Sequence, residues 1–90
     1  MSKLLKAAQA GTVESSDILI SLMPAEAATG IQVELVSPTL QQYGKHIKNL
    51  IIETLVFHGI EDVQVYANDK GALDCTIKAR VKTALERAGE

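Results

Sequence analysis

The stretch from Ile31 to Gly59, IQVELVSPTLQQYGKHIKNLIIETLVFHG, decides the fold because its hydrophobic period changes from two residues to about 3.6. Apolar and polar residues alternate over 31–36, which predicts a strand. Ser37 then offers a helix cap, and Pro38 suits the first helical position because its missing N–H costs nothing there. Gly59 is expected to end the helix as a left-handed cap. The apolar stripe of the helix is predicted to contain Leu40, Tyr43, Ile47, Leu50, Ile51, Thr54, Leu55 and His58.

Further elements are expected on both sides of this unit. Residues 11–13 are predicted to be extended, and residues 18–23 read as a strand that would pair with the one at 31–36 in an antiparallel hairpin. Residues 63–67 alternate again and are followed by turn residues at 68–71. A second amphipathic helix is predicted from 72 to 88, with Leu73, Ile77, Val81, Ala84, Leu85 and Ala88 in its apolar stripe.

The predicted order β-β-β-α-β-α indicates an α+β fold. We expect a two-layer sandwich, with a mostly antiparallel sheet and two helices packed on one of its faces. The 90 residues of the chain are enough for one hydrophobic core and not for two. A single domain is therefore expected over residues 11–90, after a loosely ordered tail at residues 1–10. The pattern leaves the order of the strands open.

Composition excludes several classes of function. The net charge is −2 and the chain has only two tyrosines and one phenylalanine, which argues against nucleic acid and anionic membranes as partners. Cys75 is the one cysteine, so a disulfide within the chain is impossible, and this composition is typical of a reducing cytoplasm. The sequence lacks the apolar core of a signal peptide and any apolar run of about 20 residues.

The residues that could form a self-contained active site are few. His46 and His58 lie about three turns apart on the predicted long helix, so they cannot share a metal ion or a catalytic triad, and a structural role is expected for each. Cys75 is interpreted as a small buried residue near the start of the second helix. Asp74 is either a first-turn acid favoured by the helix dipole or a contact for a partner.

The polar tetrad at residues 14–17, Glu-Ser-Ser-Asp, differs from these candidates. Two hydroxyls lie between two acids, just before a predicted strand. One interpretation is a plain turn. The other is a modification site, because a serine that receives a phosphodiester-linked group needs an accessible hydroxyl, and the modifying enzyme can supply the base.

Residues 10–17, Ala-Gly-Thr-Val-Glu-Ser-Ser-Asp, resemble the N-terminal signature of the acyl carrier (gamma) subunit of citrate lyase, with a valine where that signature has leucine. Residues 69–75, Asp-Lys-Gly-Ala-Leu-Asp-Cys, are similar to a second characteristic run of this family. The segment Gln42-Tyr43-Gly44 and the pair Ala79-Arg80 also fit. The resemblance covers roughly residues 7–88, and ordinary helical acyl carrier proteins match poorly.

This resemblance implies a carrier without a catalytic site of its own. Members carry 2'-(5''-phosphoribosyl)-3'-dephospho-CoA, joined through a phosphodiester to the first serine of the tetrad, which is Ser15 here. The residues alone do not separate Ser15 from Ser16. The thiol of the group carries acetyl, which an alpha subunit (acyl transferase) exchanges for citryl, and a beta subunit (citryl lyase) then releases oxaloacetate. A dedicated transferase attaches the group, and a recombinant chain made alone would lack it.

Charge and expected exposure suggest a docking surface for these partners, made of Glu14, Asp17, Asp69, Lys70 and Gly71. Two alternatives remain open. The chain could be a small regulatory or ligand-binding α+β module without a covalent group, which predicts a formed pocket. It could also be a hydrolase using Ser15, which predicts a histidine within hydrogen-bond distance of that serine.

Overall fold

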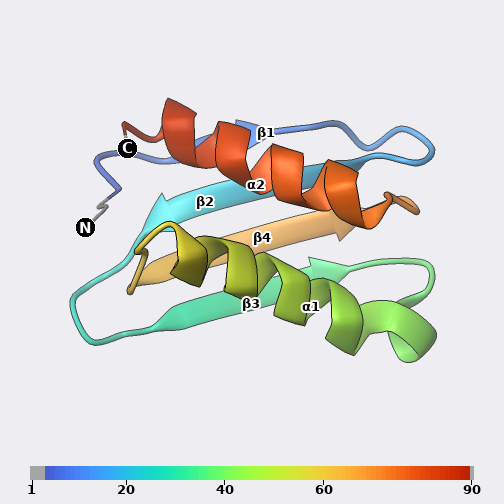
Figure 1. Ribbon diagram of the computed structural model, residues 1–90, viewed down its shortest axis with the longest axis horizontal. Coiled ribbons are helices and arrows are strands. Elements are labelled where there is room, and N and C mark those ends of the chain that lie inside the picture. The colour runs from blue at the N-terminus through green and yellow to red at the C-terminus, as the bar shows by residue number, and fades with distance from the viewer. Residues whose placement is uncertain (1–3, 90) are drawn as a thin grey trace.

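The computed structural model describes residues 4–89, and its elements follow the predicted order β-β-β-α-β-α (Figure 1). The protein is an α+β fold in which a four-stranded mixed sheet is covered by two helices on one face. The elements are β1 (Ala8–Ala10), β2 (Ile18–Pro24), β3 (Ile31–Val36), α1 (Leu40–Phe57), β4 (Val63–Asp69) and α2 (Asp74–Arg87). None of the helices described is both long and apolar enough to cross a membrane.

The strand order is β1-β2-β4-β3, which corrects the predicted hairpin between 18–23 and 31–36. β4 lies between these two strands, antiparallel to β2 and parallel to β3. The physical reason is burial. Alternate residues of β2 and β4 are almost completely buried, whereas in β3 only Leu35 is buried. The two strands with the most apolar surface to hide take the centre, and α1 carries the chain back from edge strand β3 to β4.

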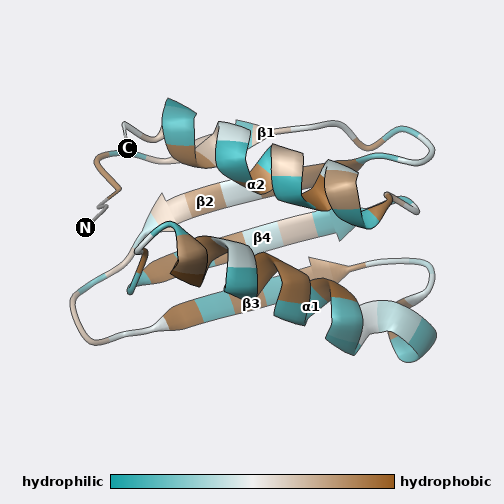
Figure 2. Ribbon diagram, viewed as in Figure 1, coloured by the Kyte–Doolittle hydropathy of each residue, from teal (hydrophilic) through white to brown (hydrophobic). Residues whose placement is uncertain are grey.

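The core lies between the sheet and the two helices. Register places Ile20 opposite Ala67 and Leu22 opposite Val65, so the inward faces of β2 and β4 form one apolar surface. Both helices contain hydrophobic segments (Figure 2), and their buried apolar residues belong to the same core cluster as those of the strands. The fully buried large side chains from all four elements include Ile18, Ile20, Leu22, Ile51, Leu55, Val63, Val65, Ile77, Val81 and Leu85.

The two ends of α1 show one correct and one incorrect prediction. Gly59 follows the C-cap with φ 80, its N–H donates to the Val56 carbonyl oxygen (2.9 Å), and the Ile60 N–H donates to the Leu55 carbonyl oxygen (3.0 Å). This is a Schellman motif, as expected for a left-handed glycine cap. The predicted Ser37 cap is wrong: the helix begins at Leu40, after Thr39, and no side chain caps it.

The second helix begins at Asp74, two residues later than predicted. Leu73, expected in the apolar stripe, is 69% exposed because it stands in an extended conformation before the first helical turn. Tyr43, at the start of α1, is likewise half exposed, although it was predicted to lie in a buried stripe. Both helices begin at the same end of the sheet and run in the same direction (Figure 1).

The N-terminal boundary also differs from the expectation. The first strand is Ala8–Ala10 and not residues 11–13, because Gly11 has φ 94 and turns the chain out of the sheet. Part of the stretch expected as a loose tail is packed: Leu4 is buried, and the Leu5 N–H donates to the Ala88 carbonyl oxygen (3.0 Å). Residues 1–3 of that tail, and Glu90 at the other end, lie outside the described part of the chain.

Candidate carrier-serine site

The tetrad at 14–17 forms a tight turn at the end of the sheet where both helices begin. The Asp17 N–H donates to the Glu14 carbonyl oxygen (3.1 Å), which closes a four-residue β-turn. Ser15 and Ser16 are its two central residues, and both are exposed. Ser16 has φ 65, the left-handed conformation that type II turns require at this position. Ser15 therefore lies at the corner of the turn, with a side chain open to solvent.

Backbone hydrogen bonds tie this turn to the end of β4. The Ser16 N–H donates to the Lys70 carbonyl oxygen (2.8 Å), and the Lys70 N–H donates to the Asp17 carbonyl oxygen (2.9 Å). These two bonds extend the pairing of β2 and β4 beyond the last residues of either strand. The serine turn and the loop at 70–73 are consequently neighbours, although they are far apart in the sequence.

Asp17 is the centre of a side-chain network below the turn. Arg80 of α2 donates from Nε to Oδ1 (3.0 Å) and from Nη2 to Oδ2 (3.2 Å), which makes a two-bonded pair. Thr12 Oγ1 donates to Oδ2 (2.7 Å), and the Ile18 N–H donates to Oδ1 (2.7 Å). Hydrogen bonds from Arg80, then from Thr12 and Ile18, lower the pKa of the Asp17 carboxyl from 3.8 to about 2.

Gly11 gives this network its room. A Cβ at this position would lie 1.8 Å from the Ile18 carbonyl oxygen and 3.2 Å from Cδ of Arg80. With φ 94, the residue also has a backbone conformation that side chains with a Cβ rarely adopt. The chain therefore needs glycine where the Arg80 side chain passes over the loop to reach Asp17.

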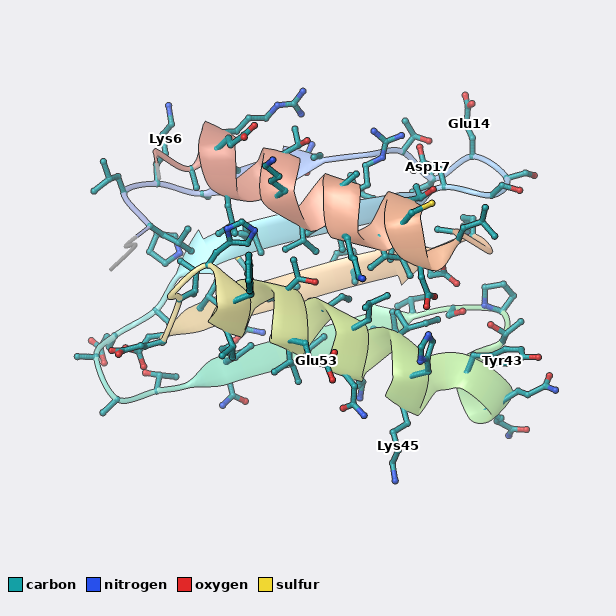
Figure 3. The ribbon with its side chains drawn as sticks, in the orientation of Figure 1. Lys6, Glu14, Asp17, Tyr43, Lys45 and Glu53 are labelled. Carbon is teal, nitrogen blue, oxygen red and sulfur yellow. The ribbon has the colours of Figure 1, made fainter. Side chains whose placement is uncertain are left out.

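The predicted docking residues separate into two groups. Glu14, Lys70 and Gly71 are exposed, and Figure 3 shows Glu14 pointing away from the body of the protein. Asp17 lies beneath the turn, with its side chain only 13% exposed and its oxygens occupied by the network. Glu14, Lys70 and Gly71 therefore remain candidates for contact with partners, whereas Asp17 is a structural anchor.

Asp69, the fifth candidate, was expected in an exposed turn but is 1% exposed. β4 continues to this residue, and its carboxylate faces inward. Its Oδ2 accepts from Ser37 Oγ (2.8 Å), and its Oδ1 accepts from the Ala72 N–H (3.0 Å). Asp69 therefore joins the loop before α1 to the loop before α2, which a buried carboxylate can do because both oxygens are satisfied.

Neither histidine forms a hydrogen bond with the serine turn within the described residues. His46 Nε2 is 3.0 Å from both oxygens of Asp74, so the pair links α1 to the start of α2. His58 is the C-cap of α1. Within residues 4–89, the Ser15 hydroxyl has no hydrogen bond to either histidine and no group of three His, Cys, Asp or Glu side chains could hold a metal ion. Cys75 is exposed, which corrects its interpretation as a buried residue.

A groove of about 510 Å³ lies between the outer faces of α1 and α2. It is distinct from the serine turn, since its residues come from the middle and C-terminal parts of α1 and from α2 after its first turn. Its lining combines apolar and charged side chains: Leu50, Glu53, Thr54, Phe57, His58, Lys78, Ala79 and Lys82.

Sequence reasoning placed the serine turn but missed the residues that hold it. The sequence indicates Thr12 and Arg80 only as motif matches and Ser37 only as a helix cap. In the structure, Thr12 and Arg80 bond the Asp17 carboxylate, and Ser37 bonds that of Asp69. Arg80 is 63 residues from Asp17 in the sequence. One feature of the sequence could have indicated this role. Arg80 lies at helical spacing from the apolar residues Ile77 and Ala84, on the side of the helix where a long charged side chain needs a partner.

Comparison with known proteins identifies close relatives. The family model of the malonate decarboxylase delta subunit matches residues 5–88. A citrate lyase acyl carrier protein of Lacticaseibacillus casei (strain BL23) is 53% identical over 83 residues, covering 92% of this chain and 80% of the relative. The citrate lyase acyl carrier protein of Halothermothrix orenii is 44% identical over 88 residues, covering 98% of this chain and 92% of that protein.

Among solved structures, a chain of a Pseudomonas malonate decarboxylase hetero-tetramer in complex with malonate has the same fold. The TM-score is 0.73 at 21% identity, with 98% of this chain and 90% of that chain covered. The citrate lyase acyl carrier protein 2 of Salmonella typhimurium is 46% identical to this chain, covering 98% of it and 90% of the relative. On the strength of these full-length relatives, the chain belongs to the citrate lyase acyl carrier proteins, the gamma subunits, which are carriers and not catalytic subunits.

Proposed function

We propose that this chain carries acetyl and citryl thioesters for citrate lyase on a phosphoribosyl-dephospho-CoA group joined to Ser15 by a phosphodiester. The observation that carries the proposal is the state of Ser15. Its side chain is exposed and makes no hydrogen bond within the described residues, which is also true of Ser16, but the Ser16 N–H is tied to Lys70 whereas the Ser15 N–H makes no hydrogen bond there. Such a serine has no evident structural task, and its hydroxyl is free to be modified.

The surroundings of Ser15 fit a large anionic substituent. The turn, which lies between the labelled Glu14 and Asp17, is at one end of the protein (Figure 3). A group attached to the exposed Ser15 would therefore have room to extend into solvent. Both helices begin at this end, and the positive ends of their dipoles favour a phosphate nearby. The Asp17 carboxylate would oppose an anion, but Arg80 neutralises it.

The group would supply a thiol that holds an acyl chain as a thioester. The protein's own contribution is to present that thiol from a fixed point on a rigid domain, which raises its effective concentration for subunits bound nearby. The proposed partners are the alpha (acyl transferase) and beta (citryl lyase) subunits and the transferase that loads Ser15. The proposed location is the cytoplasm, where these partners would act.

A matched pair of variants tests this function. Ser15→Ala and Ser16→Gly chains are incubated with the loading transferase and its precursor, then combined with purified alpha and beta subunits, and oxaloacetate release from citrate is measured. We expect Ser15→Ala to be inactive, because it lacks the attachment oxygen. Ser16→Gly should remain active, since glycine adopts φ 65 without strain. An active Ser15→Ala chain would contradict the proposal.

A ligand-binding module without a covalent group is the second candidate, because the groove between α1 and α2 is a formed concavity. It makes the opposite prediction for the variants, since neither serine lines that groove. Equal activity of both variants in cells that cleave citrate would favour it.

A further inference from the structure

The hydrogen bonds around the serine turn fix its backbone and the Asp17 carboxylate, and leave the hydroxyls of both serines exposed and unbonded. The Asp17 carboxylate accepts four hydrogen bonds, two on each oxygen, from Arg80, Thr12 and the Ile18 N–H. Thr12 Oγ1 in turn accepts from the Glu14 N–H (3.2 Å). The network therefore reaches around the loop from the residue after the serines to the residue before them.

Among the described residues, Arg80 is the one partner of the Asp17 carboxylate that comes from outside residues 12–18. It projects from α2, which is packed on the sheet through the buried side chains of Ile77, Val81 and Ala84. Its guanidinium is planar and makes two parallel bonds, so it fixes the orientation of the Asp17 carboxylate as well as its position. This pair thereby holds the turn in a fixed position relative to α2 and the core of the domain.

The two adjacent serines are not equivalent within this frame. Ser16 is held by its N–H bond to Lys70 and by its left-handed backbone, and it sits one residue from the clamped carboxylate. The Ser15 N–H makes no such bond among the described residues, so the two exposed hydroxyls differ in how the backbone beneath them is held. If the turn were mobile, each of the two neighbouring hydroxyls would at times occupy the surroundings of the other. A turn held in one conformation keeps their surroundings different.

We propose that Arg80 is a positioning residue for modification of this protein: through its two-bonded pair with Asp17 it holds the turn so that the transferase meets the Ser15 hydroxyl and not that of Ser16. This proposal rests on the proposed carrier function. Within the described residues, the Arg80 side chain bonds to Asp17 and to neither serine, so it is assigned no part in the phosphodiester chemistry. Its role is to reduce the number of turn conformations in which the wrong hydroxyl, or none, is within reach.

The test compares Arg80→Lys with Arg87→Lys. Lysine keeps the charge and the apolar stem of Arg80 but cannot make the two parallel bonds. Arg87 is a matched control, since it is also on α2 and donates from Nη1 to the Gln9 carbonyl oxygen (2.9 Å), remote from the serine turn. Each chain is loaded by the purified transferase, with initial rates measured over a range of carrier concentrations and adducts located by fragmentation mass spectrometry.

We expect Arg80→Lys to lower kcat for loading about tenfold with KM nearly unchanged, because binding is kept while fewer bound turns are competent. Adducts on Ser16 should also appear, which a loss of global stability would not produce. Arg87→Lys should load like the wild type, on Ser15 alone. Unchanged kcat and exclusive Ser15 loading in Arg80→Lys would overturn the proposal.

Two further observations keep the result interpretable. If Arg80→Lys is unfolded at the assay temperature, hydrogen exchange of the Glu14 amide in the folded wild type decides the question, because this amide donates to Thr12 of the Asp17 network. Protection matching that of β2 supports the clamp, and exchange at the rate of a free loop refutes it. If the wild-type chain itself is never loaded, the carrier function fails. If the wild type is loaded on Ser15 and Arg80→Lys is loaded identically, only the role of Arg80 fails.

Discussion

Substituting Gly11 by alanine tests the geometry on which the serine turn depends. The added Cβ would lie 1.8 Å from the Ile18 carbonyl oxygen, whereas such contacts essentially never fall below 3.0 Å. That carbonyl belongs to the first residue of β2, paired with Asp69 of β4, so it cannot move without disturbing the sheet. The residue also has φ 94, which alanine tolerates poorly.

Gly71→Ala is a matched control for this substitution. Gly71 has nearly the same backbone conformation, with φ 92, but a Cβ there would meet nothing within 4 Å. Its cost is therefore backbone strain alone, about 1 kcal/mol. Gly11→Ala adds the displacement of a backbone carbonyl and the loosening of the Arg80 pair, and we expect a total of about 3–4 kcal/mol.

Thermal unfolding followed by circular dichroism measures the difference. In a domain of this size each kcal/mol lowers Tm by roughly 4–8 °C, so Gly71→Ala should melt about 5 °C below the wild type and Gly11→Ala about 15 °C or more below it. Denaturant midpoints give a second estimate of the same free energies. Equal melting temperatures for the two variants would refute the steric argument, because only the contact with Ile18 distinguishes them.

Three other substitutions test separate parts of the structure. Gly44→Ala should raise the unfolding free energy by about 0.5–1 kcal/mol, since alanine favours the helix. Among the described residues, the added Cβ would come close to Cδ1 of the half-exposed Leu40, 2.9 Å away, and a lower Tm would show that Leu40 cannot move aside. Asp69→Ala should cost about 2 kcal/mol, because it removes a buried carboxylate, the acceptor of the partly buried Ser37 hydroxyl and the partner of the Ala72 N–H. Asp74→Ala, at an exposed pair, should cost less than about 1 kcal/mol, and equal costs in denaturant titrations would contradict this. The pKa of Asp17 is lowered from 3.8 to about 2, so the unfolded state binds more protons between these values, and its contribution to stability is complete above pH 3.8 and is lost as pH falls through about 2; Asp17→Asn should flatten this part of the pH–stability curve, and an unchanged slope would contradict the assignment.

Elements of the fold that depend on local pattern could be predicted from the sequence. Alternation defined the strands at 31–36 and 63–67, and Gly59 ended α1 with the expected left-handed cap. These features are set by residues close to one another in the chain. The order of the strands was not predictable in this way, because the place of β4 between β2 and β3 depends on which strands hide the most apolar surface.

The site shows the same division. The tetrad was recognisable as a turn because its residues favour turns locally. The roles of its acids were not, since Asp17 and Asp69 are both held by residues far away in the sequence, 63 positions in the case of Arg80 and 32 in that of Ser37. An acid in a polar segment was expected to be exposed, and a distant hydrogen-bond donor is what makes its burial favourable.

Intact-mass analysis of this chain from its native host, grown on citrate, tests the central claim most directly. We expect a mass increase equal to a phosphoribosyl-dephospho-CoA group, with fragmentation placing it on Ser15. A smaller phosphopantetheine adduct would indicate another class of carrier, and an adduct on Ser16 would contradict the assignment of the site. An unmodified chain in cells that are actively cleaving citrate would contradict the carrier function itself.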